Sequence, residues 1–159
     1  MSKSIKNLIV LSLFLSILPQ VKTYSQSFLI TKYSTDYGLP DNRVNDIAQD
    51  SLGRIWIAMA SGIAMYDGYE WTKVGKKDGV PEIEYIKIKI DKKNIIWFLP
   101  KQIYDQSIVY LDNVKWSKLD LKSPFNTNSG YTNSFEINYK KNKLQIYISR
   151  INRGLLFYT

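Results

Sequence analysis

Acid–base chemistry in this chain of 159 residues is restricted to Asp, Glu, Lys and Tyr, because the sequence contains neither His nor Cys. Their absence removes the usual zinc and redox ligand sets, the Cys nucleophile and the imidazole base of a Ser-His-Asp triad. Glu82 and Glu84 form a close pair whose side chains would point the same way from an extended strand. Such a pair could serve glycoside hydrolysis, but neighbouring surface glutamates are common. We therefore expect binding rather than catalysis, with no cofactor and no metal.

The charge pattern gives no sign of a nucleic-acid partner. The chain carries 22 Lys+Arg against 14 Asp+Glu, a formal net charge of +8, and much of the positive charge lies in pairs beside turn residues, at Lys76–Lys77, Lys92–Lys93 and Lys140–Lys141. A nucleic-acid surface would need these charges to cluster on one face. A polyanionic glycan is the acidic partner that this pattern leaves open.

Residues 1–25 have the pattern of a secretory signal peptide. Lys3 and Lys6 precede an apolar run over 8–18, which is followed by Pro19 and the small polar residues before position 26. The alternative is a membrane anchor, but the run is little more than half of the about 20 apolar residues that span a bilayer. We expect export to the periplasm or the extracellular space, with residues 26–159 as the mature chain and no membrane span in it.

An internal repeat organises the remaining sequence. Landmarks recur 41 residues apart in the pairs Gly38 and Gly79, Pro40 and Pro81, Ile47 and Ile88, Asp50 and Asp91, and Trp56 and Trp97. Trp71 and Trp116 are then 45 residues apart, so four residues are inserted in between. A third, weaker copy has Tyr147 in the place of the Trp and Gly154 in the place of Gly62.

Short apolar runs separated by turn residues predict four strands in each of the first two copies. In the first copy we expect strands at 44–49, 54–58, 63–66 and 69–74, and in the second at 85–90, 95–99, 108–111 and 114–119. In the third copy the second and third strands are recognisable around 144–148 and 154–158.

Four strands in a period of 41–45 residues, with a Trp in the second strand, predict an all-β fold of β-propeller blades. A β-sandwich is the alternative, but it has no reason to repeat a Trp at a fixed distance. The expected units are about 38–78, 79–122 and 123–159, an incomplete ring, with 28–33 as a candidate closing strand. The expected structural anchors are Gly38, Pro40, Asp50, Gly53, Trp56, Gly62, Gly79, Pro81, Asp91, Trp97, Tyr147 and Gly154.

Residues 38–58 and 62–67 resemble the two-component regulator propeller repeat. In the second copy Asp91, Asn94, Ile95 and Trp97 fit the same pattern, whereas the third copy keeps only its second and third strands. The resemblance implies a periplasmic sensory propeller of the kind that precedes a hybrid histidine kinase and often responds to oligosaccharides. A downstream kinase region, or a homo-oligomer that completes the ring, would be the implied partner.

In the resembled family, the loops that lead into a first strand or out of a second strand open on one face of the propeller. The candidate ligand-binding residues are therefore Asp41, Asn42, Arg43, Ser61, Glu82, Glu84, Lys101 and Tyr104. The expected function is an exported, non-catalytic recognition or sensory module with an oligosaccharide or a protein as ligand. The alternatives are a fragment of a propeller-type lyase or hydrolase, and a stand-alone protein-interaction scaffold.

Overall fold

The computed structural model describes residues 3–4, 7, 29–102, 107–121, 131–151 and 154–159, with Leu156 described by its backbone alone. The chain divides into two compact units, residues 1–31 and 32–159. Most of the first unit, and with it most of the expected signal peptide, lies outside the described residues. None of the described helical residues belongs to a helix with the length and apolar character needed to cross a bilayer.

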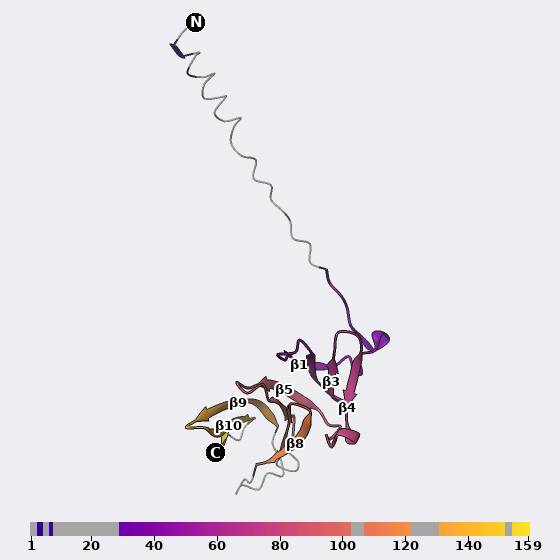
Figure 1. Ribbon diagram of the computed structural model, residues 1–159, viewed down its shortest axis with the longest axis vertical. Helices are drawn as coiled ribbons and strands as arrows, with labels where there is room; N and C mark the ends of the chain where they lie inside the picture. The colour runs from indigo at the N-terminus through magenta and orange to yellow at the C-terminus, as the bar shows by residue number, and fades with distance from the viewer. Residues whose placement is uncertain (1–2, 5–6, 8–28, 103–106, 122–130, 152–153) are drawn as a thin grey trace. The chain divides into compact units, whose positions relative to one another are not determined.

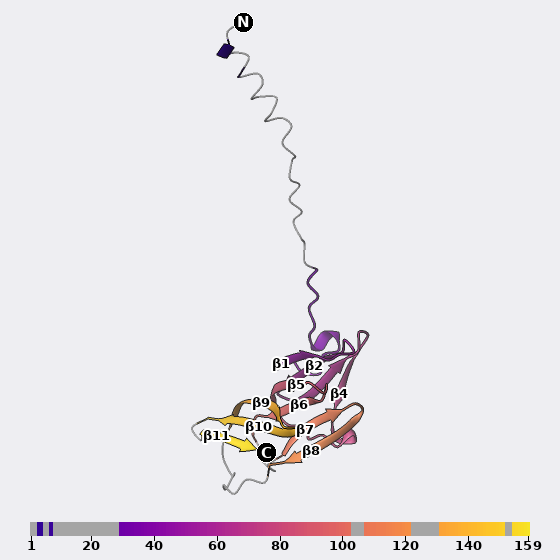
Figure 2. The same ribbon diagram turned by 60° about the vertical axis from the view of Figure 1, so that its left-hand side comes forward.

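The second unit is built from antiparallel β-strands, which confirms the predicted all-β fold (Figures 1 and 2). Two four-stranded sheets and one three-stranded sheet follow one another along the described chain, and we call them blades 1, 2 and 3. Blade 1 contains β1 Val44–Gln49, β2 Ile55–Met59, β3 Gly62–Tyr66 and β4 Trp71–Val74. Blade 2 contains β5 Tyr85–Ile90, β6 Ile96–Pro100, β7 Ser107–Asp112 and β8 Lys115–Asp120. Blade 3 contains β9 Thr132–Lys140, β10 Lys143–Arg150 and β11 Gly154–Tyr158.

Within each blade the strands pair with their neighbours in sequence, in the orders β1-β2-β3-β4, β5-β6-β7-β8 and β9-β10-β11. The first strands β1, β5 and β9 lie side by side, as Figure 1 shows, so that consecutive blades meet face to face. The described sheets do not close into a ring, in agreement with the incomplete propeller that the sequence predicts.

Two apolar clusters hold the blades together. Trp56 and Ala58 of blade 1 pack against a group from blade 2 that includes Phe98, Tyr85 and Val109. The other face of blade 2 packs against blade 3 through a second cluster: Trp97, Leu99, Ile108, Leu121, Phe135, Ile146 and Ile148. Because blade 2 is covered on both faces, all five residues of its central strand β6 are buried. This explains why the sequence reads as apolar runs without a helical period.

The first turn of blades 1 and 2 is organised by an aspartate, Asp50 or Asp91, that the repeat identified as a structural anchor. Asp50 Oδ1 accepts hydrogen bonds from the amides of Leu52 (2.9 Å) and Arg54 (3.0 Å), and Asp50 Oδ2 accepts one from the Trp56 indole Nε1 (2.9 Å). We call this arrangement an aspartate corner. It fixes the turn and orients the buried Trp56 ring at the same time.

The corner is repeated in blade 2 with the same geometry. Asp91 Oδ1 accepts from the amides of Lys93 (2.8 Å) and Ile95 (3.0 Å), and Asp91 Oδ2 accepts from Trp97 Nε1 at 3.0 Å. Trp56 and Trp97 are 3% and 2% exposed, so they occupy equivalent buried positions on the second strands, as the 41-residue repeat predicts.

Blade 3 replaces the aspartate corner by a tighter hairpin. Lys141 and Asn142 connect β9 to β10 with φ values of 49° and 63°, and Lys140 pairs directly with Lys143. A two-residue hairpin turn of type I′ requires this left-handed backbone at both positions. Tyr147 holds the register position of Trp56 and Trp97, but it is only half-buried and packs on Phe157, with ring centroids 4.8 Å apart.

Two predicted segments differ from the structure. The fourth strand of blade 1 begins at Trp71 rather than at 69, because Asp67 Oδ1 accepts hydrogen bonds from the amides of Tyr69 (2.8 Å) and Glu70 (3.0 Å) and holds them in the turn. Residues 29–33, the described part of the expected closing strand, belong to no strand here, and Phe28 lies outside the described residues. Pairing of this segment therefore stays a prediction.

Candidate functional site

One rim of the molecule is formed by the loops that lead into the first strands and out of the second strands. The same backbone hydrogen bond closes this rim in every blade: Ala60 N–H donates to Arg43 O (3.1 Å), Lys101 N–H to Glu84 O (2.8 Å) and Ile151 N–H to Tyr131 O (2.9 Å). Each blade therefore presents a pair of side chains at equivalent rim positions. We call these the rim pairs.

The rim also carries bonds between neighbouring blades. Asn45 Nδ2 of blade 1 donates to Tyr85 O of blade 2 at 2.7 Å, and the Thr132 amide of blade 3 donates to Lys101 O at 2.9 Å. The hydroxyl group of Thr132 donates to the carbonyl of Pro100 as well. These bonds fix the rim pairs of successive blades relative to one another, so that side chains from different blades form one surface.

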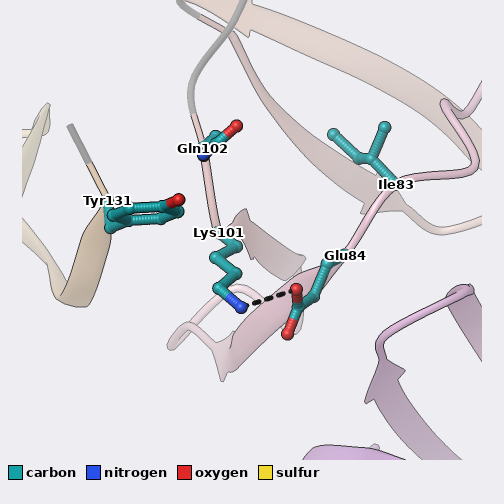
Figure 3. A pocket seen from close by; sticks show the side chains of 5 residues that line it. All are labelled: Ile83, Glu84, Lys101, Gln102 and Tyr131. Carbon is teal, nitrogen blue, oxygen red and sulfur yellow. Dashed lines mark hydrogen bonds and ion pairs between the residues drawn. The ribbon is translucent and has the colours of Figure 1, made fainter. Parts of the chain in front are cut away.

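A pocket of about 350 Å³ opens between the rim pairs of blades 2 and 3 (Figure 3). Its described lining residues are Ile83, Glu84, Lys101, Gln102 and Tyr131. A second hollow of about 480 Å³ adjoins it and shares Lys101 and Tyr131 with it. The lining of this second hollow also includes Asn45, Lys87, Thr132 and Asn133. Lys101 and Tyr131 thus separate two concave regions of the same rim.

Lys101 is at the centre of the smaller pocket. Its ammonium group lies 2.8 Å from Glu84 Oε2 and 5.9 Å from the centre of the Tyr131 ring, and Figure 3 shows the carboxylate and the ring on opposite sides of it. The side chains of Lys101 and Glu84 are 43% and 31% exposed, and Tyr131 is 48% exposed. The pocket therefore offers solvent a carboxylate, an ammonium group, an amide and the face of an aromatic ring.

The structure brings two of the eight candidate ligand residues, Glu84 and Lys101, into this pocket. Tyr104 lies outside the described residues. The remaining candidates, Asp41, Asn42, Arg43, Ser61 and Glu82, belong to the rim of blade 1 or to the chain between blades 1 and 2.

Two of the blade 1 candidates, Asp41 and Asn42, have structural partners of their own. Asn42 Oδ1 accepts from the Thr35 amide and Asn42 Nδ2 donates to the Thr35 hydroxyl, both at 3.0 Å, which anchors the chain that precedes the blade. Asp41 Oδ1 accepts from the Arg43 amide at 2.9 Å, and this bond lowers the pKa of the Asp41 carboxyl below its usual value. The Arg43 side chain is 78% exposed. Ser61 is half-buried at the turn between β2 and β3.

Glu82 and Glu84 do not act on the same groups. Glu82 Oε2 pairs with Lys73 Nζ of β4 at 3.4 Å, an interaction that lowers the pKa of Glu82, whereas Glu84 pairs with Lys101. Glu84 lines the pocket, and Glu82 is not among its described lining residues. The geometry thus gives no support to a hydrolase that would use these two carboxylates together.

Sequence reasoning missed Tyr131, Gln102 and Ile83. Tyr131 occupies the rim position of Arg43 and Glu84, both of which were identified, but the third copy has no Gly-Leu-Pro opening from which the position could be counted. The position is located only by the strand pairing of β9 with β10 in the structure, which aligns Phe135 with Ile88 and Ile47.

Comparison with known proteins agrees with the repeat. Residues 38–61 match the family model described as "Two component regulator propeller". No significant relative was found among curated proteins.

Solved structures with the same fold come from B. thetaiotaomicron. The extracellular domain of BT4673, named a one-component system in one crystal structure and a hybrid two-component system in another, matches with TM-scores of 0.60 and 0.61 at 20% and 19% identity. These matches cover 80% and 86% of this chain and 16% and 17% of the other. The extracellular domain of the hybrid two-component system BT3049 matches with a TM-score of 0.56 at 21% identity, over 83% of this chain and 18% of the other. This chain thus spans about a sixth of the length of the proteins it resembles, and the likeness establishes the propeller fold.

Proposed function

We propose that this chain is an exported, non-catalytic recognition module of a sensory propeller, and that it binds an oligosaccharide at the pocket between blades 2 and 3. The observation that carries the proposal is the half-exposed Tyr131 ring beside the Glu84–Lys101 ion pair and Gln102. The extracellular domains of the similar solved structures support an exported location and a sensory role.

The lining chemistry suits a sugar. The apolar face of a pyranose ring packs on an exposed aromatic ring, which loses little conformational entropy on binding. Sugar hydroxyl groups both donate and accept hydrogen bonds, and the Glu84 carboxylate, the Gln102 amide and the Lys101 ammonium group supply complementary partners. Backbone hydrogen bonds hold the residues in place before the ligand arrives, which lowers the cost of binding.

Calorimetric titration with a panel of neutral and acidic oligosaccharides, prepared by partial hydrolysis of polysaccharides, tests the binding site. For a sugar that binds, Tyr131→Ala should raise the dissociation constant about 10-fold, because the contact between the sugar and the ring is lost. Tyr69→Ala is the matched control, because Tyr69 is 93% exposed and is not among the residues that line either pocket. Unchanged affinity in Tyr131→Ala, or no binding across the panel, would contradict the proposal.

Export has a separate test. Amino-terminal sequencing of protein recovered from the periplasm or the medium should begin near Gln26, since Lys3, Lys6 and the apolar run after them form the expected signal peptide. An intact Met1 terminus in the membrane fraction would refute export and leave the binding test unaffected.

A further inference from the structure

Each first strand carries one extra residue near its start. In blade 1 the residues on either side of Asn45 pair with adjacent residues of β2, Met59 and Ala58, so that Asn45 is inserted into the ladder. The pairing of β5 with β6 skips Ile86 in the same way, and that of β9 with β10 skips Asn133. Such an insertion is a β-bulge, which redirects a side chain and is common beside binding sites. We call Asn45, Ile86 and Asn133 the bulge residues.

All three bulge residues line one cavity, the second hollow of about 480 Å³ on the rim. The strands β1, β5 and β9 lie side by side (Figure 1), and a bulge at the same place in each strand brings one residue of every blade to the same region. The described lining of the smaller pocket, in contrast, comes from the rims of blades 2 and 3. The recurrence of the bulge in three blades indicates a built concave surface rather than a local irregularity.

The two concave regions differ in charge. The described lining of the smaller pocket includes the carboxylate of Glu84 and the ammonium group of Lys101. The second hollow has the ammonium groups of Lys87 and Lys101, and no carboxylate is among its described lining residues. A concave surface lined by charges of one sign concentrates ligands of the opposite sign. The second hollow is therefore suited to an anionic group, and the smaller pocket to a neutral one.

Lys87 is only loosely held by its acidic neighbour. Its Nζ atom lies 3.8 Å from Asp46 Oδ2, which is beyond hydrogen-bond distance. The Asp46 carboxylate accepts hydrogen bonds from the amides of Ile47 (3.1 Å) and Ile88 (3.0 Å), and it is not among the described lining residues of the hollow. Because an ammonium group has three N–H donors, Lys87 can keep this neighbour and donate to a ligand as well.

The other lining residues suit a sugar better than a small inorganic ion. Ile86 and Ile151 offer apolar surface, and Ile151 is 49% exposed. Asn133 is exposed and adds an amide that both donates and accepts hydrogen bonds. A hollow of about 480 Å³ with apolar walls, an amide and two ammonium groups has partners for the carbon skeleton, the hydroxyl groups and a charged substituent of the same ring.

We propose that the ligand is an acidic oligosaccharide whose carboxylate or sulfate group binds in the second hollow to Lys87 and Lys101. This inference rests on the proposed sugar-binding function and adds the class of sugar. The Tyr131 ring and Lys101 line both concave regions, so one ligand chain occupies both. Its acidic group lies in the second hollow because the Glu84 carboxylate of the smaller pocket repels it.

Calorimetric titration of the wild-type chain with paired ligands tests the acidic group. The uronic-acid members of the oligosaccharide panel are compared with their carboxyl-reduced forms, and the sulfated members with their desulfated forms. For a sugar that binds, the acidic form should bind at least about 10-fold more tightly than its neutral form, as expected for hydrogen bonds to a charged group. The pair that shows this difference distinguishes a carboxylate ligand from a sulfate ligand.

Lys87→Gln should remove most of this difference. We expect the Kd of the acidic form to rise about 10-fold and that of the neutral form to change less than about 2-fold, so that binding of the neutral form also shows that the variant is folded. Lys89→Gln is the matched control, because it removes the same charge from the same strand. The Lys89 side chain is 39% exposed against 41% for Lys87, and it is not among the described lining residues of either hollow.

A carboxylate added to the hollow should also weaken binding of the acidic form. Asn133→Asp keeps the shape of the side chain and places a negative charge near the two lysines, so the Kd of the acidic form should rise at least about 10-fold. Asn138→Asp is the matched control, because Asn138 is exposed on the same strand β9 and is not among the described lining residues of either hollow.

The outcomes separate this inference from the proposed function. Equal affinity for the acidic and neutral forms, equal losses in Lys87→Gln and Lys89→Gln, or an acidic preference that survives in Asn133→Asp would each overturn the acidic ligand in the second hollow. Each of these results would leave the sugar site at Tyr131 in place, since Tyr131→Ala should weaken both forms by the same factor. A lack of binding by every member of the panel would overturn both.

Discussion

The aspartate corners of blades 1 and 2 share their hydrogen bonds to the turn amides and to the buried indole, but they differ in the fourth hydrogen-bond partner of the carboxylate. Both use the second carboxylate oxygen to hold a buried indole, at 2.9 Å from Trp56 and 3.0 Å from Trp97. In blade 1 the same oxygen also accepts a hydrogen bond of 2.7 Å from Arg54 Nε, which belongs to the same hairpin. In blade 2 this oxygen instead accepts a hydrogen bond of 2.6 Å from the hydroxyl group of Tyr139, which lies on β9 of the next blade.

This difference separates what the repeat specifies from what it leaves free. Asp, the turn amides and Trp lie within one hairpin, so their spacing in sequence is sufficient to place them. The repeat does not specify the fourth hydrogen-bond donor to the carboxylate. In blade 2 this donor, Tyr139, comes from another blade. The corner of Asp91 therefore joins two blades, and Lys92 and Lys93 pack over the same Tyr139 ring at 4.9 and 4.6 Å. The corner of Asp50 stabilises one hairpin.

Removal of either tryptophan should have the largest effect. Trp56→Ala and Trp97→Ala should each lower the free energy of unfolding by about 3–5 kcal/mol, because each empties a fully packed site between blades. Urea denaturation of the purified chain measures the effect. The exposed Tyr69→Ala should remain within about 0.5 kcal/mol of the wild type. Near-neutral substitution of both tryptophans would contradict their role as buried anchors between the blades.

Acid should weaken both corners. Burial opposes ionisation, but hydrogen bonds from Trp56 and Arg54 lower the pKa of Asp50 below its usual value, and those from Tyr139 and Trp97 do the same for Asp91. A folded-state pKa below the unfolded value of about 3.9 gives stability that is present at neutral pH and lost as the pH falls below about 4.

Urea denaturation between pH 7 and pH 3 measures this dependence. The double variant Asp50→Asn and Asp91→Asn should be less stable than the wild type at pH 7 and should lose less stability on acidification, because it has fewer carboxylates to protonate. Parallel pH profiles for the two proteins would show that the corners do not contribute to acid unfolding.

The shared corner can be tested by removal of one oxygen atom. Tyr139→Phe should cost about 1.5–3 kcal/mol, since it deletes a hydrogen bond to a charged acceptor. Tyr147→Phe is the matched control on the adjacent strand, because its hydroxyl makes a long contact of 3.4 Å to the neutral Gln145 side chain. Equal losses in the two variants would mean that the Asp91 corner holds its own hairpin alone, as the Asp50 corner does.

The smallest effects are expected at the last residue of each turn. Gly53 and Asn94 hold equivalent positions with φ values of 81° and 61°, in the left-handed region. A Cβ at Gly53 would meet nothing closer than 3.9 Å, so Gly53→Ala should cost only the conformational strain of about 1–2 kcal/mol. Asn94→Gly should change stability by less than about 1 kcal/mol. Thermal unfolding of the two variants measures these changes. A loss of stability larger than this in Asn94→Gly would mean that the hydrogen bond from the Ser51 amide to Asn94 Oδ1 (3.3 Å) contributes more to stability than the relief of backbone strain.

The sequence predicts the strands of blades 1 and 2 to within about two residues at each end, because every landmark of the repeat lies inside a hairpin or at its turn. It misplaced the start of β4, where the Asp67 side chain competes with the strand for two backbone amides. It did not predict β9 as a nine-residue strand, because blade 3 replaces the aspartate corner by a hairpin without a landmark.

The candidate site was less accessible to sequence reasoning. Glu84 and Lys101 could be identified from their place next to predicted strands, but their pairing with each other depends on the register between β5 and β6. Tyr131 enters the pocket from the next blade, and only the packing of β9 on blade 2 brings it there. Contacts between blades involve residues far apart in sequence, and such contacts leave no periodic signal in a single chain.

The rim pairs have a consequence for how such a surface can change. Their positions are fixed by one backbone hydrogen bond per blade, which does not depend on the side chains, and the side chains are as different as Arg43, Glu84 and Tyr131. Substitutions there alter charge, size and aromatic character without altering the frame. New ligand specificity can therefore evolve, or be selected from a randomised library, through combined substitutions at a few solvent-facing rim positions while the buried tryptophans stay constant.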